Sequence, residues 1–390
     1  MIRYLHRQKQ RLSYFLCNNE HWAIWITCLA LLLRFVWFAY PSGDYTDFLH
    51  PWFEELKSAG GLAAIGKPIG DYMVSYIYIL AALTHLPLPD IVSIKFLSCV
   101  GDILLAAYGM KIVYTATKDY LAAKTVYTTL LFLPTIWLSS GAWGQCDSLY
   151  TAALLACFYY MMQQHPTKAM LAYGIAFAFK LQAVFVAPVL LVLWMKKQIR
   201  FRHFFLIPVV YAAVILPAYL AGRSLVDLLL IYFCQTGTYT QLSLGAPNFY
   251  AWIPPMQETK GITVVGIVLA LIIVLIFVVL LCVKKRPITP LVLIRIAFFY
   301  ALLVPFLLPR MHERYFYPAT VLAIICCFTF QSIKDQLLLC VCEISSFFVV
   351  CRFLFGWLWV NPAWFAPPLA VVLVFSWRSI WKSYRTTPIA

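Results

Sequence analysis

Charged side chains are scarce in this chain, and long polar stretches are absent from it. Only 12% of the 390 residues are charged, and 63% are hydrophobic. A water-soluble fold needs polar side chains to cover its surface, so this composition excludes a soluble protein. Apolar runs of roughly 17–22 residues recur instead, and each matches a hydrocarbon core of about 30 Å. The sequence predicts an all-α, polytopic membrane protein with about twelve transmembrane helices.

Several common site motifs are also missing. The chain has no phosphate-binding glycine loop, no His-Glu-x-x-His sequence and no cysteine pairs at zinc spacing. The twelve cysteines are scattered, most of them within apolar runs, and Cys340 and Cys342 have no partner pair. No internal repeat is present, which weighs against the repeat-built transporters.

Positive charge outnumbers negative charge, with a formal net charge of +15. Such a balance would suit a nucleic-acid partner, but the cations lie in short segments between apolar runs. A nucleic-acid surface needs a contiguous soluble face, and none is present. Lysine and arginine between apolar runs are typical of cytoplasmic loops, so we expect membrane lipids and no nucleic acid as partners.

The charge pattern gives a predicted topology. The basic N-terminus precedes an apolar run at 22–40 that is too long for a removed signal peptide, and we interpret it as a retained first span. The stretch 72–86 is short for a span and is followed by no positive charge, so we expect an interfacial or re-entrant helix. This predicts a single membrane domain, 1–390, with cytoplasmic termini and with two long outer loops at 41–90 and 222–261. The other spans are expected at 91–113, 122–139, 148–163, 168–181, 183–195, 204–220, 261–284, 291–308, 316–332, 335–355 and 363–377.

Nineteen Lys and Arg residues fall at cytoplasmic ends in this topology, and four fall in outer loops. The acidic residues show the opposite trend. Five of the fifteen lie between residues 40 and 72: Asp44, Asp47, Glu54, Glu55 and Asp71.

Four polar clusters then share the outer face: the Asp44 loop, Gln145 with Asp147, Lys180 with Gln182, and Arg310 with His312, Glu313 and Arg314. A charge placed near lipid costs roughly 2.5–3.5 kcal/mol unless it is paired or hydrated, so such residues are functional candidates. Carboxylates opposite cations suit a reaction that takes a proton from a hydroxyl and releases an anion.

Three of these segments have recognisable sequences: WGQCDSLY at 143–150, FKLQ at 179–182 and MHERYFY at 311–317. Together they resemble the signatures of bacterial GT-C-type glycosyltransferases related to the GPI mannosyltransferases. The resemblance extends over about residues 40–320. It also includes Asp44, Phe48, Trp52, Gly60-Gly61, Gly70-Asp71-Tyr72, Lys95, Asp102 and the APNFY sequence at 246–250. One position departs from the family, because its usual Asp-Tyr-Pro-Pro is Asp71-Tyr-Met-Val here.

The resemblance implies a GT-C-like fold in the plasma membrane and an inverting transfer on its outer face. The donor would be a hexose, such as mannose, on a polyprenyl phosphate, and the acceptor a glycolipid or a cell-envelope glycan. Asp44 would be the catalytic base. The residues expected to bind substrate are Asp47, Asp71, Gln145, Asp147, Lys180, Gln182, Arg310, His312, Glu313, Arg314 and Tyr315. No cofactor is certain, although Asp44 and Asp47 could hold Mg²⁺ or Mn²⁺.

Each assignment has an alternative. Asp44 could be a turn residue, with Asp47 as the base. Asp147 could cap a helix, Lys180 could snorkel to the interface, and Glu313 could form a structural pair with Arg314.

Two further alternatives concern buried charges and the function itself. Lys95 and Asp102 lie seven residues apart on one helix face, which predicts a buried structural network, with Arg34 either snorkelling or paired to Asp102. The alternative function is a flippase or another transporter of polyprenyl-linked sugars.

Overall fold

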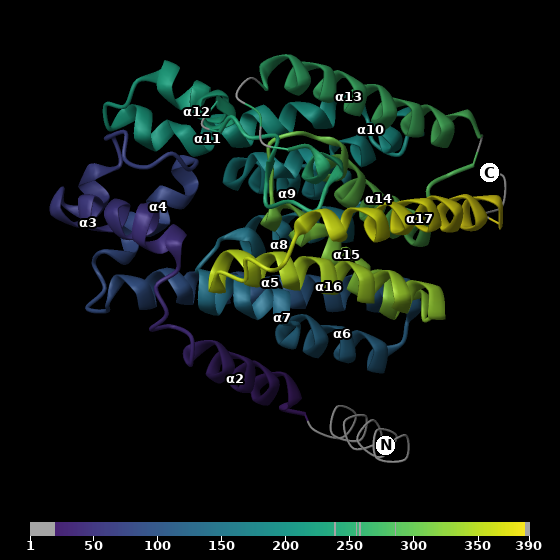
Figure 1. The fold of residues 1–390 in the computed structure, drawn as a ribbon, viewed down its shortest axis with the longest axis horizontal. Helices are drawn as coiled ribbons and strands as arrows, with labels where there is room; N and C mark the ends of the chain where they lie inside the picture. Colours follow the sequence, from purple (N-terminus) through teal and green to yellow (C-terminus); the bar gives the residue numbers. More distant parts are fainter. Residues whose placement is uncertain (1–19, 238, 255, 257–258, 285, 387–390) are drawn as a thin grey trace.

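The computed structural model describes residues 20–237, 239–254, 256, 259–284 and 286–386. The described chain is almost entirely helical, as the hydrophobic runs predict (Figure 1). The elements of the first half are α2 (Trp22–Phe35), η1 (Tyr45–Leu49), α3 (His50–Ser58), η2 (Gly61–Ala64), α4 (Val74–Leu83), α5 (Asp90–Thr117), α6 (Tyr120–Phe132), α7 (Pro134–Trp137), η3 (Leu138–Trp143), α8 (Asp147–Met162), α9 (Pro166–Phe179), η4 (Leu181–Val186) and α10 (Ala187–Met195).

The second half continues the same pattern of helices and contains a single two-stranded sheet among the described residues. Its elements are η5 (Phe201–Phe205), α11 (Leu206–Leu220), α12 (Leu225–Gly237), β1 (Ser243–Leu244), η6 (Phe249–Trp252), α13 (Lys260–Val283), α14 (Pro290–Leu307), β2 (Met311–His312), η7 (Glu313–Phe316), α15 (Tyr317–Phe330), α16 (Ile333–Phe355), η8 (Pro362–Trp364) and α17 (Ala366–Thr386). The two strands pair in parallel, with Ser243 opposite Met311 and Leu244 opposite His312.

A helix is present at each of the twelve predicted spans, but twelve complete spans are not established. Among the described residues, six helices are long and apolar enough to cross a membrane, or seven if the bent α6–η3 pair counts as one span. The six are α5, η5–α11, α13, α14, α16 and η8–α17. Other apolar helices, such as α2 and η4–α10, have only 10–17 residues. The hydrophobic runs therefore predict where helices form, but not that each helix is a full span.

The two predicted outer loops contain more structure than the topology alone requires. The stretch 72–86 forms α4, whose ten residues extend about 15 Å, half of a hydrocarbon core. This length agrees with the expectation that α4 does not span the membrane by itself. The second loop, 222–261, contains an apolar helix, α12, that was not predicted.

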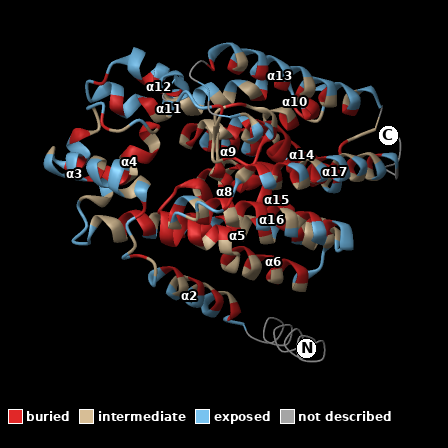
Figure 2. Cartoon of the chain, viewed as in Figure 1, coloured by how far each residue is buried: buried red, intermediate tan, exposed pale blue. Residues whose placement is uncertain are grey.

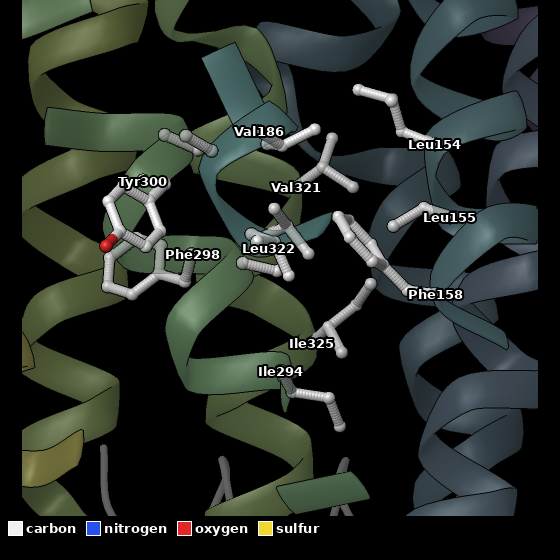
Figure 3. Close-up of a cluster of buried hydrophobic side chains, with 14 of the residues drawn as sticks. Leu154, Leu155, Phe158, Val186, Ile294, Phe298, Tyr300, Val321, Leu322 and Ile325 are labelled. Carbon is white, nitrogen blue, oxygen red and sulfur yellow. The ribbon is translucent and has the colours of Figure 1, made fainter. Parts of the chain in front are cut away.

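The centre of the bundle is formed by α8, α14 and α15, with α5, α9, α16 and α17 around them. Figure 2 shows that buried residues concentrate there, whereas α11, α12 and α13 expose much of their surface. Figure 3 shows the core, where Phe158 of α8, Ile294 of α14 and Ile325 of α15 interdigitate. Exposed apolar helices around a packed centre are what a lipid-facing surface requires.

The directions of the central helices distinguish two ends of the bundle, one of which carries the polar clusters. α8 and α15 begin at the end that carries the polar clusters, and α9 and α14 finish there. Lys111, Lys118, Lys124 and Lys168 lie at the opposite end, each over a tyrosine or tryptophan ring. The predicted cytoplasmic cations Arg3, Arg7, Lys9, Arg11 and Lys285 lie outside the described residues.

Candidate functional site

The carboxylate of Asp44 is the point at which the predicted clusters meet. Its Oδ2 atom accepts hydrogen bonds from Trp143 Nε1 at 3.0 Å, Gln145 Nε2 at 2.5 Å and Arg314 Nη1 at 2.6 Å. Among the described residues, Oδ1 has no hydrogen-bond partner. The Asp44 side chain is 14% exposed, so a ligand can reach it. One oxygen is therefore held in place, and the other is available to a substrate.

Two buried cations anchor the chain where it enters this loop. Lys95 of α5 is fully buried and donates to the carbonyl oxygens of Trp37 at 2.8 Å and Tyr40 at 2.5 Å. Arg34 pairs with Asp102 at 2.8 Å, which confirms the alternative that Arg34 is paired rather than snorkelling. Lys95 and Asp102 share a helix face, but they bind different partners, so the predicted network consists of two separate anchors.

The WGQCD sequence forms the turn that faces Asp44. Gly144 has φ +80°, a left-handed conformation that glycine adopts without a steric penalty. The backbone N–H of Gln145 then donates to Ser139 O at 3.0 Å, and Ser42 Oγ donates to Trp143 O at 2.8 Å. This turn allows Trp143 and Gln145, two residues apart, to donate to the same carboxylate oxygen.

A buried ion pair lies next to this turn. Lys180 Nζ donates to Asp147 Oδ1 at 2.8 Å, and the two side chains are 8% and 0% exposed. Lys180 is therefore not snorkelling, and Asp147 is the first residue of α8 rather than its capping residue. Asp147 Oδ2 is buried and has no hydrogen-bond partner. Buried polar atoms normally have hydrogen-bond partners, so Asp147 Oδ2 is a candidate contact for a bound ligand.

Tyr72 lies between the turn that contains Gln145 and the buried Asp147–Lys180 pair. Sequence reasoning did not select Tyr72 as a site residue. Its hydroxyl donates to Gln145 Oε1 at 3.3 Å, and Lys180 Nζ lies 5.5 Å from its ring centroid. Trp143 was missed in the same way. Both lie inside the quoted motifs, and an aromatic N–H or O–H that is buried usually has a hydrogen-bond partner, which was the available signal.

The MHERYFY segment contributes Arg314 to the site, but it places Arg310 elsewhere. Arg314 binds Asp44 and lies 5.5 Å from the centroid of Trp143. Arg310 has φ +61° and donates to Thr236 O at 3.3 Å, while its backbone N–H donates to Leu242 O at 2.7 Å. Arg310 thus holds the predicted second outer loop and makes no hydrogen bond to the Asp44 cluster.

Burial disfavours the charged forms of both Glu313 and His312. Burial raises the pKa of Glu313 to about 7, although the neighbouring charge of Arg314 opposes this shift. Glu313 forms no ion pair with Arg314, so the predicted structural pair is wrong. Burial and the charges of Arg314 and Lys180 lower the pKa of His312 to about 2, and its ring lies between those of Tyr239 and Tyr315.

The remaining predicted residues lie around this centre. Asp47 is exposed and accepts a hydrogen bond from Thr46 Oγ1 at 3.1 Å, so it does not join Asp44. Burial raises the pKa of Asp71, while the charges of Arg314 and Lys180 lower it, which places Asp71 beside the site. Gln182 lies beside the phenol of Tyr315, next to Phe185.

The side chains able to hold a metal ion are not the predicted ones. In the described part of the chain, His50, Glu54 and Asp90 bring their ligand atoms within 4.8 Å of one another. His50 Nδ1 lies 2.6 Å from Asp90 Oδ2, which also accepts from the Tyr45 hydroxyl at 2.8 Å. Asp44 is already bound by three hydrogen-bond donors, which disfavours a cation on its Oδ2.

No protein-family model matches the chain, and no curated protein matches it in sequence. The functional argument therefore rests on the residues themselves.

Proposed function

We propose that this chain is a GT-C-type glycosyltransferase that inverts the anomeric carbon of a hexose, such as mannose. The donor is the hexose on a polyprenyl phosphate, and the acceptor is a glycolipid or a cell-envelope glycan. The observation that carries the proposal is the Asp44 carboxylate, with Oδ2 held by three donors and Oδ1 left open. A positioned carboxylate with one accessible oxygen is suited to accept a proton from a hydroxyl.

The reaction is a single displacement. The acceptor hydroxyl oxygen attacks the anomeric carbon, its proton passes to Asp44 Oδ1, and the bond between that carbon and the phosphate oxygen breaks. The phosphate leaves with the electron pair and gains negative charge. Arg314 and Lys180 are the cations that pair with Asp44 and Asp147 in this site. An arginine can bind a phosphate through two parallel hydrogen bonds.

Arg314 can contact the base and the phosphate together. Its Nη1 atom donates to Asp44, and its buried Nε atom has no hydrogen-bond partner among the described residues. The Nε–H is therefore available to donate to the departing phosphate.

The two ends of the bundle support an outer-face site in the plasma membrane. The polar cluster lies at one end, and Lys111, Lys118, Lys124 and Lys168 lie at the other. Lysine and arginine favour the cytoplasmic side, so the Asp44 end faces outward and the C-terminal end of α17 faces the cytoplasm. A transporter places its polar residues near the bilayer midplane, whereas the Asp44 cluster lies at one end of the helix bundle.

The direct test is turnover by purified protein given polyprenyl-phosphate hexoses and a glycolipid extract. We expect Asp44→Asn to lower the rate by a factor of about 10² to 10⁴, the usual contribution of a general base. The matched control is Asp47→Asn, which removes an equal charge three residues away and should keep near wild-type turnover. Retained turnover in Asp44→Asn would remove Asp44 as the base, and lipid movement without sugar transfer would favour the flippase.

A further inference from the structure

A basic cluster lies at the opposite end of the bundle from Asp44, where α10, α13 and α17 all finish. We define the Trp381 cluster as Lys196, Lys284, Arg286, Trp381 and Arg385. It is built from three stretches of sequence, 148–226, 259–312 and 344–390, none of which contains an aspartate or glutamate. These stretches therefore supply no acidic side chain to the cluster.

Backbone carbonyls at the helix ends hold this cluster together. Lys196 Nζ donates to the carbonyl oxygens of Cys282, at 3.3 Å, and Lys284. Arg286 donates to the carbonyl oxygens of Tyr384, at 3.4 Å, and Arg385. Both cations thus cap the last carbonyls of α13 and α17, an arrangement favoured by the helix dipole.

Two other cations stand over a single aromatic ring. Lys284 Nζ lies 5.7 Å from the centroid of Trp381, and the Arg385 guanidinium carbon lies 5.6 Å from it. Both side chains are exposed. Two like charges on one indole repel each other, and an anion beside the ring would relieve that repulsion.

The surface that leads to these cations is apolar. α13 exposes Leu275, Ile276, Val279 and Val283 along the turns before Lys284, and α17 exposes Val374 and Phe375 before Trp381. Trp377 stacks on Trp381 with centroids 6.0 Å apart. A ligand that matches this surface has long apolar chains below an anionic head, and tryptophan favours that boundary in a bilayer.

We propose that the Trp381 cluster binds the headgroup of an anionic phospholipid, with its phosphate between Lys284 and Arg385. The acyl chains lie against the exposed faces of α13 and α17. This site is separate from the Asp44 site and does not depend on the reaction proposed there, because the two lie at opposite ends of the bundle.

The test measures lipid retention and thermal stability of the full chain in lipid nanodiscs. One set contains phosphatidylcholine alone, and the other contains an added fraction of phosphatidylglycerol. We expect phosphatidylglycerol to be retained and to raise the melting temperature of the wild type. Lys284→Gln with Arg385→Gln should lower the affinity for this lipid about thirtyfold, since each cation near an anionic headgroup contributes about fivefold.

A matched control removes two exposed lysines from the other end of the bundle, Lys67→Gln with Lys260→Gln. The control should bind phosphatidylglycerol as the wild type does. Equal affinity in the Lys284/Arg385 variant would overturn the proposal, as would equal stabilisation by phosphatidylcholine. If inorganic phosphate at the same concentration stabilises the protein as well as phosphatidylglycerol does, the site binds free anions and the lipid assignment is wrong.

Discussion

At the scale of the residue, Arg314 is the side chain on which the candidate site most depends. It reaches Asp44 across 270 positions of sequence, and its guanidinium stands over Trp143. Its Nε atom is buried and has no hydrogen-bond partner. Arg314 is therefore held on one side by the carboxylate and the ring, with an additional donor available to a ligand.

Arg314→Gln should lower transfer by a factor of about 10² or more, the usual effect of removing one donor from a developing negative charge. Arg310→Gln is the matched control, because it removes the same charge four residues away, where the side chain binds Thr236 O. We expect the Arg310 variant to keep most of its turnover. Equal losses in the two variants would show that Arg314 acts through general charge or folding.

The buried Glu313 carboxyl makes stability depend on pH. Its pKa rises from 4.5 to about 7 on folding, so the unfolded chain loses this proton at lower pH than the folded chain does. The contribution to stability is complete below about pH 4.5 and is lost as the pH rises through 7. Up to about 3 kcal/mol of unfolding free energy is involved.

Melting temperatures between pH 5 and pH 8 test this expectation. The wild type should lose stability as the pH rises, and Glu313→Gln, which cannot ionise, should lose less. Parallel curves for the two proteins would show that another group causes the change.

At the scale of the element, close packing of α5 on α8 positions the buried Asp147–Lys180 pair. A Cβ atom on Gly101 would lie 2.4 Å from Ser148 Oγ and 3.0 Å from the backbone nitrogen of Leu149. Ser148 Oγ has little freedom to move, because it donates to Ser98 O at 3.0 Å. Gly101 therefore permits the approach of the helix that begins with Asp147.

Gly101→Ala should lower stability by roughly 1–3 kcal/mol, because overpacking forces the two helices apart. Transfer should fall with it, since Asp147 moves with α8. The matched control is Gly261→Ala in α13, where the added Cβ meets nothing within 4 Å. That variant should be as stable as the wild type, as measured by thermal unfolding in detergent. A neutral Gly101→Ala would show that α8 adjusts without cost.

Hydrophobic runs predict the helices well because each helix must satisfy its own backbone in lipid. They do not predict where a helix breaks. The predicted span 122–139 bends at Leu133, whose extended backbone precedes Pro134, and Glu343 of α16 accepts the N–H of Thr135 at 3.0 Å. That acceptor comes from a helix more than 200 residues away, so no local pattern indicates it.

The candidate site was also predictable in part. Residue types and motifs predicted that Asp44, Gln145 and Arg314 belong to one site, because polar and charged side chains near lipid are costly and few. The pattern did not show that all three contacts use one oxygen, nor that Lys95 binds backbone carbonyls. Those details depend on tertiary geometry. Asp47 and Arg310, chosen by proximity in sequence, point to other partners.

At the scale of the whole molecule, the two ends of the bundle should face different compartments. A cysteine replacing Lys67 should react with a membrane-impermeant thiol reagent added to intact cells, and a cysteine replacing Lys382 should react only after lysis. The label added beyond that of the parent protein gives the readout, because the chain has cysteines of its own. Labelling of both variants in intact cells would contradict the predicted topology.

The separation of Asp44 and Arg314 in sequence also has a consequence in time. At synthesis rates of roughly 5–20 residues per second, Asp44 leaves the ribosome about 15–50 s before Arg314 does. During that interval the carboxylate lacks its arginine, and a chain that ends early never acquires it. The site is thus completed late in biogenesis, so a prematurely ended chain would insert most of its helices without completing the Asp44 site.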